Sequence, residues 1–377
     1  MTPSTPAYAP LTAAFEDQDS AFSAAFSVLR EAIGRNAFPS ALVAVTHLGK
    51  LVALKSFGRF TYEDNSAAVV TGTLFDIASL TKVVATTTMA AILYERGLLE
   101  LDATVAGTIP EFLADACGEA DARRRDVTFR MLLAHSSGLP AYEKLFLKAH
   151  ARKELLSAAF TTSLCADPGT RAEYSDIGFI TLGAALERIA QESLDVFCQR
   201  EIFGPLAMTG TTFNPPTETR GQIPPTTDER DGLRKRIIQG EVQDENACIL
   251  GGVAGHAGLF STAEDLAAFA HAMLSGGRPI LRPETVAVFT RRESAPAGTS
   301  RALGWDTPSV PSQSGKYFGP ASFGHLGYTG TSLWVDPDRQ LSITLLTNRT
   351  WPDCANQAIK QVRPEFHDAV VEAVDKL

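Results

Sequence analysis

Ser79-Leu80-Thr81-Lys82 is the stretch that decides the fold and the chemistry predicted for this chain. It puts a serine hydroxyl and a lysine amine three residues apart, and residues i and i+3 share one face of a helix. A serine hydroxyl is a poor nucleophile until a neighbour accepts its proton, and a lysine amine held in a desolvated site can do so. The stretch therefore predicts a serine hydrolase, with Ser79 as the nucleophile and Lys82 beside it.

The flanking residues predict where this serine lies. An apolar run at 73–78 leads into it, and apolar residues at near-helical spacing follow it as far as Gly97. Ser79 is therefore expected at the N-terminus of a helix, where the helix dipole and unpaired backbone N–H groups favour negative charge. An oxyanion that forms beside the nucleophile needs such a place. Taken alone, Ser-x-x-Lys is more typical of a helix cap followed by a solvated lysine.

A second polar group, Tyr174-Ser175-Asp176, stands directly before another apolar helix. The apolar face of that helix comprises Phe179, Leu182, Leu186 and Ile189. Asp176 has a structural interpretation as the cap of the helix, and Tyr174 has one as a half-buried core residue.

A third group, at 323–330, contains His325 between glycines and precedes two strand-like runs around a turn at 336–338. Glycines beside a histidine at a sheet edge allow a substrate backbone to approach closely. The structural interpretation of the same residues is a glycine-rich loop with a satisfied histidine.

Three such groups in this order resemble the serine β-lactamase and penicillin-binding-protein family, which includes class C β-lactamases, D,D-peptidases and related esterases. The first motif is intact, the second resembles Tyr-x-Asn with Asp176 in the Asn position, and the third resembles the His-x-Gly variant that ends at Gly327. The intervals between the motifs leave room for the helical domain of that family. Further similar stretches lie at 132–139, 251–263 and 335–337, so the resemblance covers most of the chain.

The resemblance implies a role for each matched residue. Ser79 would attack a carbonyl to form an acyl-enzyme, its proton would leave through Lys82 and Tyr174, and water would hydrolyse the intermediate. The backbone N–H groups of Ser79 and Tyr328 would form the oxyanion hole. The positions that would contact the substrate are Asp176, His325 and Gly327.

An alternative register matches Ser175-Asp176 to the first two letters of Ser-Asp-Asn. It would make Ser175 the proton-transfer residue and put Ile177 in the place of the amide. Isoleucine cannot hydrogen-bond a substrate, so the register with Tyr174 first is preferred.

Two departures from the class C pattern bear on the substrate. A carboxylate at Asp176 would favour the ammonium form of Lys82, which leaves Tyr174 as the base, with a pKa lowered by the lysine charge. A histidine at 325 replaces a permanent charge with a group that is mostly neutral at pH 7. Both changes weaken the attraction for a substrate carboxylate, which esters of small acids do not need. The preferred prediction is therefore an esterase or amidase. One alternative is a β-lactamase or a penicillin-binding D,D-carboxypeptidase. An alternative of another class is a non-catalytic relative that binds peptides or glycans.

The predicted fold class is α/β (α+β): an antiparallel sheet flanked by helices, with an inserted, mostly helical domain. Apolar spacing predicts helices at 22–33 and 366–374, and β-prone runs predict hairpins at 41–57 and 332–346.

The two ends of the chain are expected to share one domain. Residues 1–97 and 241–377 would form the sheet domain, and 98–240 the helical domain, without strand pairs and with an exposed excursion at 215–236. The active site would lie in the cleft between the two domains.

Composition limits the partners. The 377 residues carry a net charge of −9 and are 45% hydrophobic, which indicates an ordinary globular protein and argues against nucleic acid as a partner. The expected partner is a small molecule: an ester, a β-lactam or a D-amino-acid peptide. No cofactor and no metal are expected, because His256, Asp244 and Asn246 have an irregular spacing that favours a loop network.

Residues 1–19 contain no basic region and no long apolar stretch, so the sequence predicts neither a signal peptide nor a membrane-spanning helix there. The expected location is the cytoplasm; a leader missing from this start would instead place the protein in the periplasm or outside the cell. The five cysteines, at 117, 165, 198, 248 and 354, are interpreted as free thiols.

Overall fold

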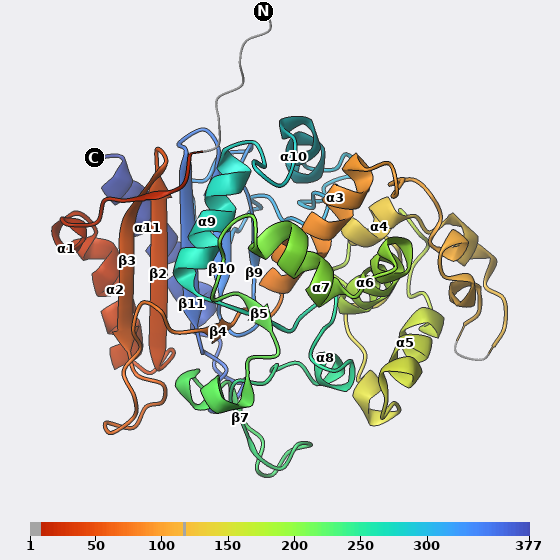
Figure 1. The fold of residues 1–377 in the computed structure, drawn as a ribbon, viewed down its shortest axis with the longest axis horizontal. Coiled ribbons are helices and arrows are strands. Elements are labelled where there is room, and N and C mark those ends of the chain that lie inside the picture. The colour runs from red at the N-terminus through yellow and green to blue at the C-terminus, as the bar shows by residue number, and fades with distance from the viewer. Residues whose placement is uncertain (1–8, 116–117) are drawn as a thin grey trace, which may run out of the picture.

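The computed structural model of the chain describes residues 9–115 and 118–377. Its largest element is a six-stranded sheet with the strand order β1-β3-β2-β11-β10-β9 (Figure 1), in which every pair is antiparallel except β1 with β3. The strands span Thr12–Ala13 (β1), Ser40–His47 (β2), Lys50–Gly58 (β3), Phe323–Leu326 (β9), Ser332–Asp336 (β10) and Leu341–Thr347 (β11). Strands from both ends of the chain therefore lie side by side.

Both predicted hairpins are present. β2 and β3 are joined at Leu48 and Gly49, whose φ angles of 50° and 76° match the left-handed central residues of a type I′ turn. The twist of this turn suits paired strands, which explains why so short a connection suffices. β10 and β11 form the second hairpin, and β9, which carries His325, pairs with β10 at one edge of the sheet.

Helices cover both faces of the sheet. α2 (Ser23–Gly34) and α11 (Ile359–Val374) cover one face, and α9 (Ala263–Leu274) covers the other (Figure 1). On the first face, strand residues such as Val43 and Ile343 share an apolar cluster with the helix residues Phe26 and Phe366. The predicted fold class and both terminal helices are confirmed.

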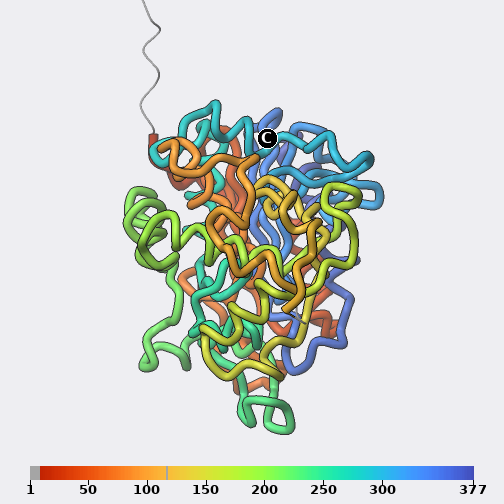
Figure 2. Tube along the Cα trace, turned by 90° about the vertical axis from the view of Figure 1, so that its right-hand side faces the viewer, coloured from red at the N-terminus to blue at the C-terminus, as the bar shows by residue number. Residues whose placement is uncertain are grey.

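The middle of the chain forms the helical part of the molecule. Its α-helices are α4 (Phe129–Leu133), α5 (Arg152–Thr161), α6 (Asp176–Ala190) and α7 (Leu194–Cys198), and Figure 2 shows the yellow and green segments that contain them in front of the sheet. The other α-helices of the described residues are α1 (Gln18–Ala21), α3 (Thr88–Glu95), α8 (Glu245–Ile249) and α10 (Pro283–Thr290). One apolar cluster runs from the sheet through α3 and α6 to α9, so a single core joins both parts. The division into 1–97 with 241–377 and 98–240 stays a prediction.

The expectation that 98–240 lacks strand pairs is wrong. β5 (Thr212–Phe213) pairs with β8 (Leu259–Ser261), which also pairs with β4 (Phe75–Asp76), and β6 (Thr227–Asp228) pairs with β7 (Ile237–Ile238). Each of these strands is two or three residues long, which is too short to leave a periodic pattern in the sequence. Tertiary contacts set their pairing.

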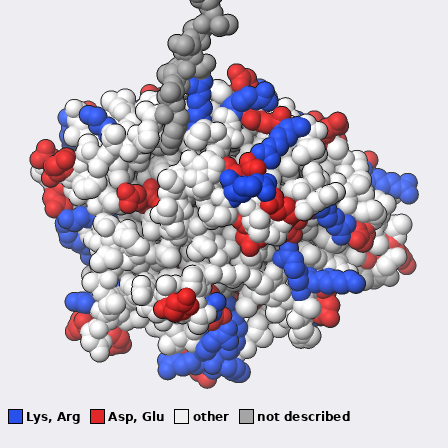
Figure 3. Space-filling view, viewed as in Figure 1, with Lys and Arg blue, Asp and Glu red and all other residues white. Residues whose placement is uncertain are grey.

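The excursion at 215–236 is only partly exposed. Lys and Arg side chains gather over it at the bottom of Figure 3, whereas both charge signs are interspersed elsewhere on that face. Arg230 and Lys235 are exposed, but Glu229 and Arg234 form an ion pair whose side chains are only 10% and 6% exposed. The expectation of an exposed excursion is therefore confirmed only for part of the segment, because this ion pair is buried.

Four of the cysteines lie in the described residues, and all four are free thiols, as predicted: Cys165, Cys198, Cys248 and Cys354. Cys117 lies outside the described residues. Of the helices that the structure describes, none combines the length and the apolar character that crossing a membrane requires.

Candidate active site

The polypeptide turns sharply at the predicted nucleophile. β4 ends at Asp76, Ala78 adopts a left-handed conformation with a φ of 47°, and Ser79 lies in the turn that leads into the π-helix η1 (Lys82–Thr87) and α3. The Asp76 carboxylate accepts a hydrogen bond from the Ala78 amide (2.8 Å). A left-handed alanine is strained and persists only where its surroundings fix it. The turn thus holds Ser79 at the start of a helix, as the sequence predicts.

The structure brings together the side chains of Ser79, Lys82 and Tyr174. The Ser79 Oγ accepts one hydrogen bond from the Tyr174 hydroxyl (2.7 Å) and another from the Lys82 ammonium (3.0 Å). The Lys82 Nζ also donates to the Asp176 carboxylate (2.6 Å) and to the backbone carbonyl of His256 (2.9 Å). The lysine side chain is completely buried, so all three N–H groups of its ammonium are engaged within the protein.

Ser175, not Asp176, caps α6. The Ser175 Oγ accepts a hydrogen bond from the Gly178 amide (3.0 Å) and donates one to the Pro140 carbonyl (2.7 Å). Both hydrogen-bonding roles of this hydroxyl are therefore used away from the nucleophile. The structural interpretation of Asp176 as the cap is wrong, because the preceding serine reaches the third amide of the helix and leaves the carboxylate to the buried lysine.

Burial and the Asp176 carboxylate set the protonation states of this cluster. Burial alone would lower the pKa of Lys82, but the charges and hydrogen bonds of Asp176 and Tyr174 outweigh it and raise the pKa above its ordinary value. Burial, reinforced by Asp176, raises the pKa of the Tyr174 phenol to about 12, although Lys82 acts in the opposite direction. Lys82 thus acts on this pKa in the predicted direction, but the predicted net result, a lowered pKa that leaves Tyr174 as the base, is wrong. At neutral pH the cluster holds an ammonium and a neutral phenol.

The loop at 327–331 is tied to the strand that precedes the nucleophile. The hydroxyls of Thr329 and Thr331 donate to the backbone carbonyls of Asp76 (2.8 Å) and Ile77 (3.0 Å), respectively. These two bonds join segments that lie far apart in the sequence. They hold the backbone of the loop against the turn that carries the serine.

Glycine at position 327 permits this close approach. A Cβ on Gly327 would overlap the Thr331 hydroxyl and stand 2.6 Å from the carbonyl oxygen of Ile77. Within the described chain, neither the amide of Ser79 nor that of Tyr328 donates to another protein group. Both predicted oxyanion-hole amides are thus available to a substrate oxygen.

His325 lies in β9, and the centre of its ring is 6.0 Å from the centre of the Tyr174 ring. Its Nδ1 donates to the Leu326 carbonyl (2.8 Å), because a carbonyl oxygen can only accept. Burial, with the positive charges of Lys82 and Arg301, lowers the pKa of His325 to about 3, so the ring is neutral, as predicted. Its Nε2 is a buried acceptor without a partner among the described residues.

Arg301 puts a positive charge beside the neutral His325. Its guanidinium carbon is 5.5 Å from the centre of the Tyr174 ring, and its Nη1 is 3.6 Å from the Asp306 carboxylate. Sequence reasoning missed this residue, because it lies in a loop and belongs to none of the motifs. Arg301 thus adds a cation to the cavity wall that the motifs did not predict, and Asp306 compensates part of its charge.

These side chains line one cavity of about 740 Å³. Its wall contains every predicted site residue except the buried Lys82: Ser79, Tyr174, Asp176, His325, Gly327 and Tyr328. Residues that the motifs did not identify as site residues also line it, among them Asp76, Gln243, Glu245, Arg301, Arg349, Lys360 and Arg363.

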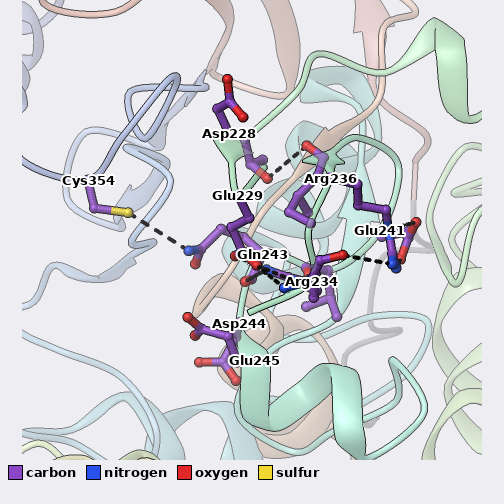
Figure 4. A network of polar contacts seen from close by, with 12 residues as sticks. Asp228, Glu229, Arg234, Arg236, Glu241, Gln243, Asp244, Glu245 and Cys354 are labelled. Atoms are coloured by element: carbon purple, nitrogen blue, oxygen red, sulfur yellow. Dashed lines mark hydrogen bonds and ion pairs between the residues drawn. The ribbon is translucent and has the colours of Figure 1, made fainter. Parts of the chain in front are cut away.

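A network of ion pairs supports one wall of the cavity (Figure 4). Arg234 pairs with Glu229 (2.6 Å) and donates to the backbone carbonyl of Gln243 (2.7 Å). The Gln243 amide in turn donates to the Asp76 carboxylate (2.7 Å), whose pKa burial raises to about 6 in spite of this bond. The excursion thus helps to hold the strand that leads into Ser79.

His256 and Asp244 form a hydrogen-bonded pair on the cavity wall, with 2.9 Å between Nε2 and Oδ1. Asn246 accepts a bond from the amide of Phe146 (3.0 Å) and donates to the carbonyl of Glu143 (2.8 Å). Asp244 caps α8 and Asn246 lies in its first turn, so these contacts join the start of α8 to neighbouring loops. In the part of the chain that the structure describes, no group of three or more His, Cys, Asp and Glu side chains is arranged to hold a metal ion.

A helix-covered antiparallel sheet with a Ser-Lys-Tyr cluster in its cleft is the architecture of the β-lactamase and transpeptidase class of proteins. The Beta-lactamase family model matches residues 25–363, and the chain belongs to this family. The predicted family is confirmed.

Two curated relatives and one solved structure illustrate the similarity. A putative D-alanyl-D-alanine carboxypeptidase of Escherichia coli (strain K12) is 31% identical over 344 residues, which are 83% of this chain and 79% of that protein. An N-acetylmuramyl-L-alanine amidase of Bacillus subtilis (strain 168) is 31% identical over 346 residues, 83% of this chain and 77% of that protein. The structure of EstCE1, a hydrolase with promiscuous acyltransferase activity, has a TM-score of 0.74 at 20% identity and covers 94% of this chain and 99% of its own.

Proposed function

We propose that this protein is a serine hydrolase that cleaves ester or amide bonds through an acyl-enzyme on Ser79. The observation that carries the proposal is the Ser79 hydroxyl, which accepts hydrogen bonds from a buried ammonium and a neutral phenol on the wall of a cavity. A non-catalytic relative that binds peptides or glycans would not need these three side chains in contact. Esters of small acids are the simplest substrates, because they require no charged anchor.

Acylation begins with the substrate carbonyl oxygen between the amides of Ser79 and Tyr328. Lys82 first hands one of its protons to the Asp176 carboxylate, which lies 2.6 Å away, and becomes a neutral amine. The Ser79 Oγ then attacks the carbonyl carbon, and its proton passes to the Lys82 Nζ. One proton is thus stored on the carboxylate that stands in the place of a neutral amide.

Collapse of the tetrahedral intermediate breaks the bond to the leaving group. Tyr174, a neutral phenol with a pKa of about 12, donates its proton to the departing oxygen or nitrogen. The tyrosine recovers a proton from Lys82, and Lys82 recovers one from Asp176, so the proton of Ser79 ends on the leaving group. Water then attacks the acyl-enzyme by the reverse sequence and releases the acid.

A D,D-carboxypeptidase activity is the second candidate, and Arg301 is the observation that favours it. A C-terminal carboxylate on the leaving group could pair with this guanidinium, which lies over the Tyr174 ring. The relative named as a putative D-alanyl-D-alanine carboxypeptidase supports the same candidate activity. A β-lactam, which also carries a carboxylate, would use the same charge.

Substitution of the nucleophile tests the proposal. We expect Ser79→Ala to lower kcat for p-nitrophenyl acetate by about 10³-fold or more with the fold intact, which is the scale for a broken catalytic unit. In intact-mass spectra, a fluorophosphonate should add to the wild type and not to the variant. Ester turnover within about tenfold of the wild type would remove Ser79 from the mechanism.

Arg301→Gln separates the two candidates. A carboxypeptidase should lose about 10-fold or more in kcat/KM for a diacetyl-lysyl-D-alanyl-D-alanine peptide relative to p-nitrophenyl acetate, since a charge-assisted hydrogen bond is lost. An enzyme restricted to small esters should show no peptide hydrolysis before or after the substitution.

A further inference from the structure

Two arginines without an acidic partner lie side by side in the wall of the active-site cavity. Arg349 follows β11, Arg363 lies in α11, and each is only 4% exposed. Among the residues that the structure describes, neither guanidinium forms an ion pair with a carboxylate. Figure 4 shows the neighbouring Cys354 directed toward Gln243, so the segment after β11 faces the wall built by the excursion.

Neutral acceptors occupy only part of the hydrogen-bonding capacity of these arginines. Arg349 donates from Nε to the Tyr328 carbonyl (2.6 Å) and from Nη1 to the carbonyl of Cys354 (3.1 Å). Arg363 donates to the side chain of Gln313 (3.1 Å) and to the carbonyl of Thr331 (3.2 Å). No described group accepts from the Nη2 of Arg349 or from the buried Nε of Arg363.

The charges of the two arginines act on each other. Burial lowers the pKa of Arg363 to about 9, and the charge of Arg349 acts in the same direction. Buried cations are costly unless an anion compensates them. Arg124 is also buried without an acidic partner, but it donates to three backbone carbonyls and does not line this cavity. The contacts of Arg124 join backbone segments to one another, whereas Arg349 and Arg363 border a cavity that a ligand can fill.

Lys360 extends this charge toward solvent. It lies three residues before Arg363 on the same helix, is exposed and lines the same cavity. The acidic residues of the cavity wall do not neutralise the three cations, because Asp176 pairs with Lys82 and Asp244 with His256. The other acidic residues of the wall also have partners outside the three cations: Asp76 accepts from two backbone amides, Asp306 lies 3.6 Å from Arg301, and Glu245 lies beside the Tyr142 hydroxyl (3.5 Å). We call Arg349, Lys360 and Arg363 the cationic corner.

We propose that the cationic corner binds a carboxylate on the acyl part of the substrate. The inference rests on the proposed function, in which Tyr174 protonates the leaving group. Arg349 and Arg363 contact the loop that carries the Tyr328 amide: the guanidinium carbon of Arg349 is 4.3 Å from the centre of the Tyr328 ring, and Arg363 donates to the Thr331 carbonyl. The cation beside Tyr174 is instead Arg301, so we assign the group bound by the cationic corner to the part of the substrate that stays on Ser79. Guanidinium groups bind carboxylates through paired hydrogen bonds, and the free donors of Arg349 suit this role. The predicted substrates are esters or amides of dicarboxylic or similarly acidic acids.

Half-esters of dicarboxylic acids test this inference, because they keep one leaving group while the acyl part changes. The probes are the mono-p-nitrophenyl esters of glutaric, adipic and suberic acid, each paired with a p-nitrophenyl ester of a fatty acid of equal chain length. For at least one chain length, we expect the wild type to prefer the half-ester in kcat/KM by about 10-fold or more. The preference should shrink as NaCl is raised from 0.05 to 0.5 M, in part because salt screens the exposed Lys360.

Variants of the cationic corner test whether its residues cause the preference for the half-ester. We expect Lys360→Glu to lower the ratio of half-ester to neutral-ester kcat/KM by about 5-fold or more, and Arg363→Gln to lower it at least as much if its melting temperature shows that it folds. Lys360 is exposed, so its variant tests the inference even if Arg363→Gln does not fold. The matched control is Lys50→Glu, an exposed lysine in the β2–β3 hairpin that does not line the cavity, and its ratio should equal that of the wild type.

The outcomes separate this inference from the proposed function. Turnover of the neutral esters by Ser79→Ala at the wild-type rate would overturn the proposed function. A wild type that hydrolyses neutral esters through Ser79 but never prefers the half-ester would overturn only the cationic corner. A preference for the half-ester that is unchanged in Lys360→Glu and in folded Arg363→Gln would also overturn the cationic corner and leave the proposed function in place.

Discussion

At the scale of single residues, the departure from the family pattern at Asp176 changes the protonation of the whole cluster. A neutral amide at this position would accept a hydrogen bond from Lys82 but could not take its proton. The carboxylate raises the pKa of Lys82 and also contributes to the high pKa of Tyr174. At neutral pH, Lys82 is therefore an ammonium and Tyr174 a neutral phenol, and the mechanism that we propose depends on the transfer of a lysine proton to Asp176.

Tyr174→Phe and Ser175→Ala test neighbouring residues with opposite expected effects. The phenylalanine keeps the packing but removes the proton donor, so we expect kcat for p-nitrophenyl acetate to fall by about 10² to 10⁴-fold. The alanine removes the cap of α6, so we expect a loss of about 1 kcal/mol in the free energy of unfolding with kcat nearly unchanged. Measured kinetics and urea unfolding of both variants check this. Greater damage to kcat in the serine variant would mean that the Ser-Asp register describes the site.

Asp176→Asn tests the stored proton. We expect kcat/KM at pH 7 to fall by about 10²-fold. We also expect kcat/KM to begin to increase at a higher pH than in the wild type, because Lys82 must then lose a proton to solvent before it can act as the base. A pH–rate profile from pH 5 to 10 measures both effects. Since Ser175 caps the helix, circular dichroism should show an intact fold. A variant with the wild-type profile would exclude proton storage on this carboxylate.

At the scale of elements, the site depends on the contact between β4 and the loop at 327–331. Thr329 and Thr331 fasten the loop to the carbonyls of β4 and its neighbour Ile77, and the excursion fastens β4 from the other side through Gln243. The amide of Tyr328 belongs to the loop, and the amide of Ser79 belongs to the turn that follows β4. The spacing of the two proposed oxyanion-hole amides is thus set by hydrogen bonds from threonine hydroxyls to backbone carbonyls and not by catalytic side chains.

Gly327→Ala should therefore impair catalysis without removing any reactive group. Its Cβ would collide with Thr331 and push the amide of Tyr328 out of place, so we expect kcat to fall by about 10² to 10³-fold, as for a lost oxyanion-hole donor. Gly319→Ala is the matched control, because its Cβ would meet nothing nearer than an Asp338 oxygen at 3.6 Å. Comparable kinetics for the two alanine variants would show that the position of the loop does not limit the reaction.

At the scale of the whole molecule, buried ionisable groups make the stability depend on pH. Burial lowers the pKa of His325 and of His367 to about 3, and it lowers the pKa of His135 well below 6.5. Asp76 acts in the opposite sense, since burial raises its pKa from 3.8 to about 6. Burial also raises the pKa of Glu245 and of Asp265 and lowers that of His47. The ordinary pKa of histidine, near 6.5, lies in weak acid, so the histidines decide the sign there.

We expect the free energy of unfolding to fall as the pH drops from 6.5 toward 5. In this window the unfolded chain binds protons on the three histidines and the folded protein does not, which costs on the order of 1.4 kcal/mol per pH unit for each fully titrating group. Asp76 offsets part of this loss, because the folded protein binds its proton below about pH 6. Urea unfolding at pH 7.5, 6.5, 5.8 and 5.0 measures the slope.

Replacement of one buried histidine should reduce that slope. His367 packs against Phe318 and Phe366, so His367→Phe keeps an aromatic ring there and removes one titrating group. His150→Phe is the control, because His150 is exposed. Equal slopes in the two variants and the wild type would show that His367 does not contribute to the acid sensitivity.

The sequence by itself determined the local features of this protein. The two hairpins, the terminal helices, the position of Ser79 at the start of a helix and the order of the three motifs all follow from patterns within short segments, and the structure has them. The spacing of apolar residues and the residues at turns suffice for such features, because they depend on neighbours along the chain. The family membership follows from the same motifs.

Only the tertiary structure decided the environment of the site. The high pKa of Tyr174, the cap by Ser175, the charge of Arg301, the cationic corner and the two-residue strands all depend on contacts between segments far apart in the sequence. Burial and the summed field of neighbouring charges fix such properties, and neither leaves a periodic or local signal. The sequence thus indicated which residues would meet in the cleft, but the folded chain set their charges and their surroundings.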